Sequence, residues 1–254
     1  MNKSTKILFM VLVIIFIIVY VAHRNTTTYQ VEPESIPKLT KQQAENLDKY
    51  RDRFARNEYH LEKALKAVNE LKSALDTMKG NVYKDVSIRL KILHHRSIIH
   101  LEEIIESLKT YEEYPNLSQQ ELLDEAINEL KKIDQEIMGD SLRHRDIQSA
   151  FYFTLNTLAK AEVNISESAL KTSQNELAML ALKQAQLHVK NAYLMDYANQ
   201  QNGAEIKSLE ADIFKELDSL IASDSISVTL VDARLNKISN ELDSLIGLIK
   251  SRNN

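Results

Sequence analysis

Hydrophobic residues recur at steps of three and four along most of the chain from residue 40 onwards. This spacing places apolar side chains on one face of an α-helix and polar ones on the other. The first such stripe comprises Leu47, Tyr50, Phe54, Leu61, Leu65, Val68, Leu71, Leu75 and Met78. The segment opens with Thr40 and Gln43, which have the spacing of a capping box, and closes at Gly80. The pattern predicts one long amphipathic helix.

Six further segments show the same period. They lie at about residues 82–111, 118–139, 142–169, 177–195, 206–220 and 235–249. The apolar arc of residues 82–111 is the widest, so we expect this helix to pack centrally. Ser118 with Glu121 and Thr229 with Asp232 resemble helix starts. No segment sustains the alternation of a strand, so the chain is predicted to be all-α, with about seven helices forming an elongated bundle.

The last of these segments has its apolar residues on a single stripe. Leu235, Ile238, Leu242, Leu245 and Ile249 follow at steps of three, four, three and four. A lone helix of this length is marginal in water, so the stripe must be buried. Five apolar positions make a short seam for a stable coiled coil, which favours docking within the chain over docking onto a second chain.

Few residues break these helical patterns. The chain has only 4 Gly and 3 Pro, and Gly80, Gly139 and Gly203 fall at predicted helix boundaries. A sheet-rich fold would need more turn residues. Agreement between the breakers and the apolar period therefore supports the all-α prediction.

An uncharged apolar run precedes the helical part. Residues 7–22, ILFMVLVIIFIIVYVA, lie between Lys6 and Arg24 and span roughly 24 Å as a helix. Snorkelling of the flanking basic side chains extends this toward the ~30 Å hydrocarbon core. A cleaved secretory signal is the alternative, but Ala22 is preceded two positions earlier by bulky Tyr20 rather than by a small residue. We predict a retained single membrane-spanning helix.

The charges around this run predict its orientation. Lys3 and Lys6 precede it, whereas residues 25–38 contain no basic residue before Lys38. The positive-inside rule then places the N-terminus in the cytoplasm and the body outside it, in the periplasm or at the cell surface. Residues 25–39 include two of the three prolines and lack a helical period, so we expect an extended tether.

The predicted organisation has four parts. They are a membrane anchor at 1–24, the tether at 25–39, and helical units at 40–138 and 139–254. Residues 73–77, SALDT, resemble residues 168–172, SALKT, and each is followed by a turn signal and a long helix. One explanation is that the two units are related helical hairpins. Helical composition alone also generates such short matches.

The composition excludes several classes of function. With no Cys, the chain has no disulfide, thiolate nucleophile or Cys-ligated metal. Phosphate-binding loops rich in glycine and the common hydrolase motifs are missing. Three basic residues lie within the first 24, so the remainder has 29 basic against 36 acidic residues. We therefore expect no nucleic-acid partner, since phosphate binding needs a basic surface.

Histidines are the side chains in this sequence that best fit a metal-binding or catalytic site. His94, His95 and His100 lack the His-x₃-His spacing that presents two imidazoles on one helix face. The other histidines of the body, His60, His144 and His188, could join them only through tertiary packing. Carboxylates such as Glu102, Glu106, Asp124 and Glu125 occur without a Glu-x-x-His motif, so we expect solvated faces paired with Lys or Arg three or four residues away. We predict no catalytic, cofactor-binding or metal-binding residue.

The anchor, the tether and the long apolar stripes together favour a protein without enzymatic activity. We predict a membrane-tethered extracytoplasmic module that binds a partner protein or assembles with copies of itself. The alternative is an extracytoplasmic helical bundle that senses or binds a ligand in a cavity between helices and works through a separate partner. The sequence identifies neither the partner nor the ligand.

Overall fold

The computed structural model describes residues 39–77, 83–111, 117–138, 144–195, 203–222 and 228–253. Both the predicted anchor, residues 7–22, and nearly all of the predicted tether lie outside these residues. Among the helices that the structure describes, none is long and apolar enough to cross a bilayer.

The described part of the chain is all-α, as predicted. It contains seven helices and no strand: α2 (Lys41–Thr77), α3 (Tyr83–Lys109), α4 (Leu117–Met138), α5 (His144–Lys171), α6 (Asn175–Leu194), α8 (Ala204–Ala222) and α9 (Val228–Asn253). Each falls on a segment for which the apolar period predicted a helix. The period therefore identified every helix in the described residues.

Two of the predicted helix starts are displaced. Helix α2 begins at Lys41, directly after Thr40, as the capping pattern predicted. Helix α4 begins at Leu117, one residue before Ser118, and α9 begins at Val228, one residue before Thr229. Ser118 and Thr229 thus lie in the first turn of their helices, and the predicted starts agree with the observed ones to within the one or two residues by which helix ends are assigned.

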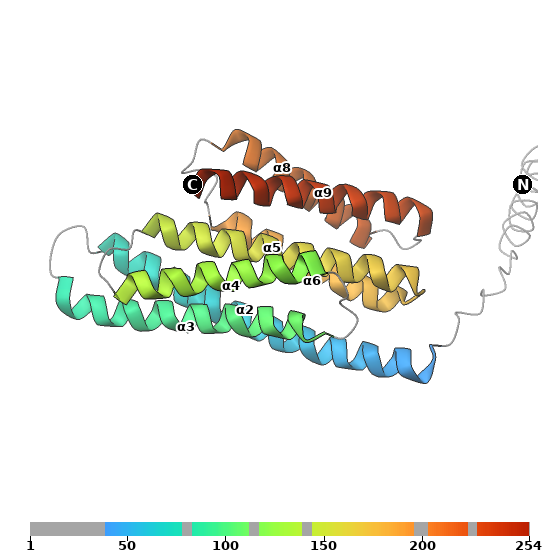
Figure 1. Ribbon diagram of the computed structural model, residues 1–254, viewed down its shortest axis with the longest axis horizontal. Coiled ribbons are helices and arrows are strands. Elements are labelled where there is room, and N and C mark those ends of the chain that lie inside the picture. The colour runs from blue at the N-terminus through green and yellow to red at the C-terminus, as the bar shows by residue number, and fades with distance from the viewer. Residues whose placement is uncertain are drawn as a thin grey trace, which may run out of the picture. The chain divides into compact units, whose positions relative to one another are not determined.

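Helix α5, rather than α3, is the central helix. Every described side chain from Ile147 to Ser166 is buried except Asn164, which is half-buried. Figure 1 shows α5 between the α8–α9 pair and the α3–α4 pair, and α5 packs against α3, α4, α6 and α9. The prediction that residues 82–111 pack centrally is wrong, because α3 exposes part of its wide apolar arc to solvent.

Small and polar residues explain why α5 was not recognised as central. Ala, Ser, Thr and Asn interrupt its apolar stripe, yet they permit close helix approach. Two of the polar side chains bond to the backbone of their own helix: Thr154 Oγ1 donates to Ala150 O at 2.8 Å, and Asn156 Nδ2 donates to Tyr152 O at 2.9 Å. A helix can therefore be buried all round without being apolar all round.

The end of α5 is sharply defined. Ser173 has a φ of 58°, in the left-handed region. The amide of Gln174 donates to Ala169 O at 2.8 Å and that of Ser173 donates to Leu170 O at 3.0 Å, the two bonds of a Schellman motif. This turn reverses the chain, so that α6 returns along α5.

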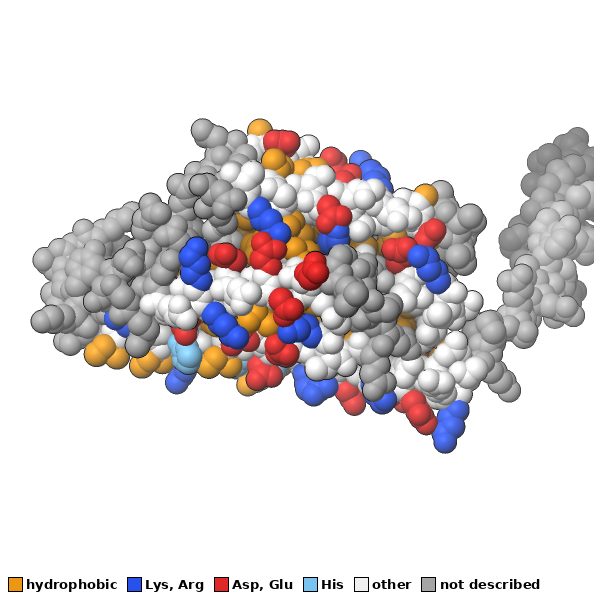
Figure 2. Space-filling model, in the orientation of Figure 1, with side chains coloured by type: hydrophobic (Ala, Val, Ile, Leu, Met, Phe, Trp, Pro, Cys, Tyr) orange, Lys and Arg blue, Asp and Glu red, His pale blue; other side chains and the backbone are white. Residues whose placement is uncertain are grey.

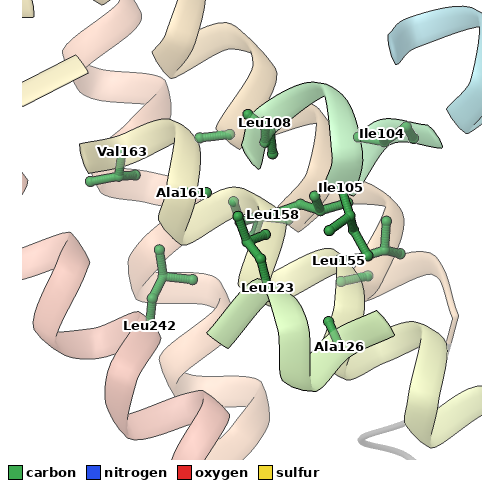
Figure 3. Close-up of a cluster of buried hydrophobic side chains, with 14 of the residues drawn as sticks. Ile104, Ile105, Leu108, Leu123, Ala126, Leu155, Leu158, Ala161, Val163 and Leu242 are labelled. Carbon is green, nitrogen blue, oxygen red and sulfur yellow. The ribbon is translucent and has the colours of Figure 1, made fainter. Parts of the chain in front are cut away.

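The predicted docking of the last helix within the chain is confirmed. All five residues of its stripe, Leu235, Ile238, Leu242, Leu245 and Ile249, are fully buried, and α9 packs on α5 and α8. Figure 3 shows Leu242 beside core residues of α4 and α5, including Leu123 and Leu158. On the polar side, Arg234 and Lys237 of α9 both pair with Glu216 of α8, at 2.8 and 3.0 Å.

Residues Gln42–Asn254 form one compact unit. Helix α5, which lies in the second predicted unit, packs against α3 and α4 of the first. The division into units at 40–138 and 139–254, and their origin as related hairpins, stays a prediction.

Candidate functional site

A buried ion pair joins α2 to the central helix. Glu162 of α5 is fully buried, and its two carboxylate oxygens accept hydrogen bonds from the Arg53 guanidinium at 3.3 and 3.5 Å. The hydroxyl of Tyr50 also donates to this carboxylate. Arg53 is 4% exposed and Tyr50 is fully buried. Removing either charge would leave the other unpaired in the core, which is strongly unfavourable.

Two tyrosine rings enclose the Arg53 guanidinium. Its carbon lies 4.1 Å from the ring centroid of Tyr50 and 4.8 Å from that of Tyr111, and the two rings meet edge to face. Burial lowers the pKa of Arg53, but the Glu162 carboxylate, together with Tyr50 and Tyr111, more than offsets burial, so the pKa of Arg53 is raised. Burial, and then the same carboxylate, raises the pKa of the Tyr50 hydroxyl. Arg53 therefore stays charged and Tyr50 stays a hydrogen-bond donor.

A groove lies beside this ion pair, between α2 and α3. Its volume is about 440 Å³. Lys49, Arg53 and Arg56 line it from α2, and Glu103 and Glu106 line it from α3. The α2 residues are four and three positions apart, so they share one helix face. The groove thus has a basic wall and an acidic wall.

Two histidines meet further along the same helix pair. The Nδ1 atoms of His60 and His100 lie 3.0 Å apart, so one ring donates and the other accepts. The ring of Tyr59 contacts both imidazoles edge to face. Burial, and then the neighbouring His60, lowers the pKa of His100. Sequence spacing could not reveal this pair, because its members come from different helices.

An apolar strip is exposed on α3. Ile88 is 62% exposed, Ile92 48% and Ile99 40%, and the side chain of His95 is 58% exposed. Their spacing of four, three and four residues aligns them on one face of the helix. Figure 2 shows hydrophobic side chains gathered along the lower left edge of the molecule, over α3. We call Ile88, Ile92, His95 and Ile99 the α3 strip.

Two other histidines are buried in the bundle. Burial lowers the pKa of His94 to about 4, and burial followed by the charge of Arg53 lowers the pKa of His188 to about 3. Neither ring nitrogen of His94 has a hydrogen-bond partner. The side chain of His144 lies outside the described residues. The histidines considered from the sequence thus divide into the His60–His100 pair, exposed His95, and two rings inside the core.

Two of the four carboxylates considered from the sequence pair between helices, not along one helix as predicted. Asp124 of α4 pairs with Lys109 of α3 at 2.7 Å, and Glu125 of α4 pairs with Lys250 of α9. Glu106 does have a partner three residues away, Lys109, at 3.6 Å. Within the described ranges, no three His, Asp or Glu side chains are grouped so that they could hold a metal ion.

The buried ring of His94 predicts a pH-dependent stability. Below the usual pKa of 6.5 the unfolded chain protonates this imidazole, whereas the folded protein does so only near pH 4. The unfolded state then binds more protons, so this histidine makes stability fall as the pH falls through that window. The unfolding free energy of His94→Leu minus that of the wild type should therefore increase as the pH falls. We expect this difference to be roughly 2 kcal/mol larger at about pH 4.5 than at about pH 7.

Urea unfolding of both proteins at several pH values measures this difference. His95→Leu is the control, since it removes an exposed imidazole from the same helix. An equal gain in the control, or a constant difference between His94→Leu and the wild type, would contradict the role of burial.

The groove, the histidine pair and the α3 strip all lie on α2 and α3, so this helix pair is the candidate functional face. No family model matches the chain, and no curated protein or solved structure matches it either.

Proposed function

We propose that this protein is a non-catalytic assembly module, in which α3 pairs with α3 of a second copy. The observation that carries the proposal is the α3 strip. Single exposed apolar residues are common on protein surfaces. Here three isoleucines share one helix face at steps of four and seven residues, which are the steps between core positions of a helix–helix seam.

The charges of α3 favour a second copy as the occupant. Its first half carries Lys84, Arg89, Lys91 and Arg96 against the single acid Asp85, and its second half carries Glu102, Glu103 and Glu106 against the single base Lys109. Antiparallel pairing sets each basic half against the acidic half of the partner copy. Parallel pairing would set like charges together. A two-fold antiparallel interface is also self-complementary, as dimer interfaces commonly are.

This arrangement specifies which residues of the strip meet. With the two-fold axis between His95 and Arg96, Ile92 of one copy lies opposite Ile99 of the other, and the reverse pair forms on the far side of the axis. Tyr59 of α2, which is 54% exposed, contacts His100, the residue after Ile99, and adds exposed aromatic surface to the same helix pair. The seam is short, so its affinity in solution should be modest.

A membrane anchor would allow even a short seam to hold two copies together. The proposal places residues 7–22 across the bilayer as a retained anchor, residues 25–39 as a tether, and the body on the extracytoplasmic side. The uncharged apolar run and the basic residues before it support this topology. Copies anchored in one membrane share a plane, which raises their effective concentration and favours weak pairing.

The second candidate function is ligand binding by the helical bundle, acting through a separate partner. The groove between α2 and α3 favours it, because its volume of about 440 Å³ lies in the range of small-molecule sites.

The antiparallel pairing of α3 can be tested by cross-linking, because the chain has no native Cys. We expect a disulfide between an Ile92→Cys chain and an Ile99→Cys chain that carry different tags and share one membrane. Two copies of Ile92→Cys should not cross-link, because their α-carbons would be offset by roughly 10 Å along the seam, beyond the reach of a disulfide.

Phe214→Cys is the matched control, since Phe214 is also an exposed apolar residue, at 38%, but lies on α8. A second experiment adds Ile92→Lys to the chain that carries Ile99→Cys and keeps the Ile92→Cys chain as its partner. The cross-link should decrease, because the lysine would bury a charge in the seam. Cross-linking of Ile92→Cys with itself would indicate a parallel seam. Cross-linking of Phe214→Cys as efficiently as the mixed pair would show random collision.

The proposed topology is tested by protease added to intact cells, stripped of any outer envelope. Digestion of the helical body under these conditions is expected, because residues 25–254 should face the outside. A cytoplasmic protein serves as the control for membrane integrity. Full protection of the body until the inner membrane is lysed would reverse the orientation.

A further inference from the structure

The groove between α2 and α3 has charged walls that do not pair with each other. Lys49 and Arg56 of the basic wall form no ion pair with any described residue, and Glu103 of the acidic wall forms none either. A salt bridge needs a nitrogen–oxygen distance of at most about 4 Å. The charged atoms of Lys49 and Arg56 therefore lie farther than this from those of Glu103, and the groove between them has room for a ligand.

The two remaining charged residues of the groove are already compensated. The guanidinium of Arg53 is held by the Glu162 carboxylate, so Arg53 adds no net charge to the groove. Glu106 lies 3.6 Å from Lys109. The uncompensated charges are thus the cations of Lys49 and Arg56 on one side and the carboxylate of Glu103 on the other.

Arg53 also supplies a second sign of an incomplete site. It lines the groove, is 4% exposed, and its Nε is buried without a hydrogen-bond partner. A buried donor without a partner is unfavourable, and a ligand acceptor or a water molecule would relieve it. The rings of Tyr50 and Tyr111 and the Glu162 carboxylate hold the guanidinium in place, so this part of the groove is preorganised.

We propose that the groove binds a small zwitterion of the amino-acid class. The ligand carboxylate lies against Lys49 and Arg56, and the ligand ammonium lies against Glu103. A ligand with one charge would be attracted by one wall and repelled by the other, whereas a zwitterion is attracted by both. In an α-amino acid both charged groups are carried by one carbon, and the volume of about 440 Å³ leaves room for the side chain that branches from it.

This inference deepens the second candidate function and rests on it. The groove is lined from residues 46–56 of α2 and 103–111 of α3, and the strip ends at Ile99, so the two sites share no residue. In the antiparallel seam Ile88 of one copy lies level with Glu103 of the other, so ligand binding is measured on the unpaired protein in detergent. The binding experiment and the cross-linking experiment can therefore fail independently.

Isothermal titration calorimetry on the full chain in detergent tests the proposal. Each standard L-amino acid is titrated, followed by two derivatives of the tightest ligand: the N-acetyl form, which keeps only the anion, and the carboxamide, which keeps only the cation. We expect one or more free amino acids to bind, and both derivatives to bind at least roughly tenfold more weakly. Binding of no amino acid would overturn the proposal, and so would equal binding of either derivative.

Variants then locate the site. Lys49→Ala combined with Arg56→Ala, and separately Glu103→Gln, should each weaken binding by roughly 10- to 100-fold, the effect of losing a hydrogen bond to a charged group. Lys183→Ala on α6 and Glu205→Gln on α8 make the same kinds of change on exposed residues away from the groove. Equal weakening in these controls, or unchanged binding in the groove variants, would overturn the assignment. A circular dichroism melt of each variant shows whether weaker binding results from misfolding. If the double variant fails to fold, Glu103→Gln, the mildest change, tests the assignment of the site.

Discussion

The carboxylate of Glu162, buried in the middle of the bundle, is the constraint on which the α2–α3 face depends. An ionised carboxylate is very costly in a protein core unless it is paired and hydrogen-bonded. Arg53 reaches it from α2 with two hydrogen bonds, and Tyr50 adds a third. Because these partners lie one turn apart on α2, that helix can satisfy Glu162 in only one register and one rotation about its axis.

Fixing α2 in this way determines what its neighbours present to solvent. With Arg53 turned inward, Lys49 and Arg56 on the same face border α3 and form the basic wall of the groove. Helix α3 is buried through residues such as Ile98 and Ile105, while Ile92 and Ile99 remain exposed. The same contacts that stabilise the core thus leave a charged groove and an apolar strip side by side, and these carry the two proposals for function.

The sequence predicted the helices far better than the candidate face. Apolar spacing identified each described helix, because burial of a stripe repeats every three or four residues whatever the helix packs against. It misplaced the central helix, because α3 looked more apolar than α5, and the burial of Asn156, Thr154 and Glu162 depends on hydrogen bonds rather than on composition. The His60–His100 contact, the Arg53–Glu162 pair and the groove join residues 40 to 109 positions apart. Such contacts require the tertiary packing, which no local pattern contains.

A double-mutant cycle on Arg53 and Glu162 is the most direct test of this constraint. Unfolding free energies are measured for Arg53→Met, for Glu162→Gln, which keeps an acceptor for the Tyr50 hydroxyl, and for the double variant. If the buried pair holds α2 in place, each single variant should lose roughly 3–5 kcal/mol, because it leaves one charge without its partner, and the double variant should lose less than the sum. Losses below about 1 kcal/mol in the single variants, or strict additivity in the double variant, would contradict it.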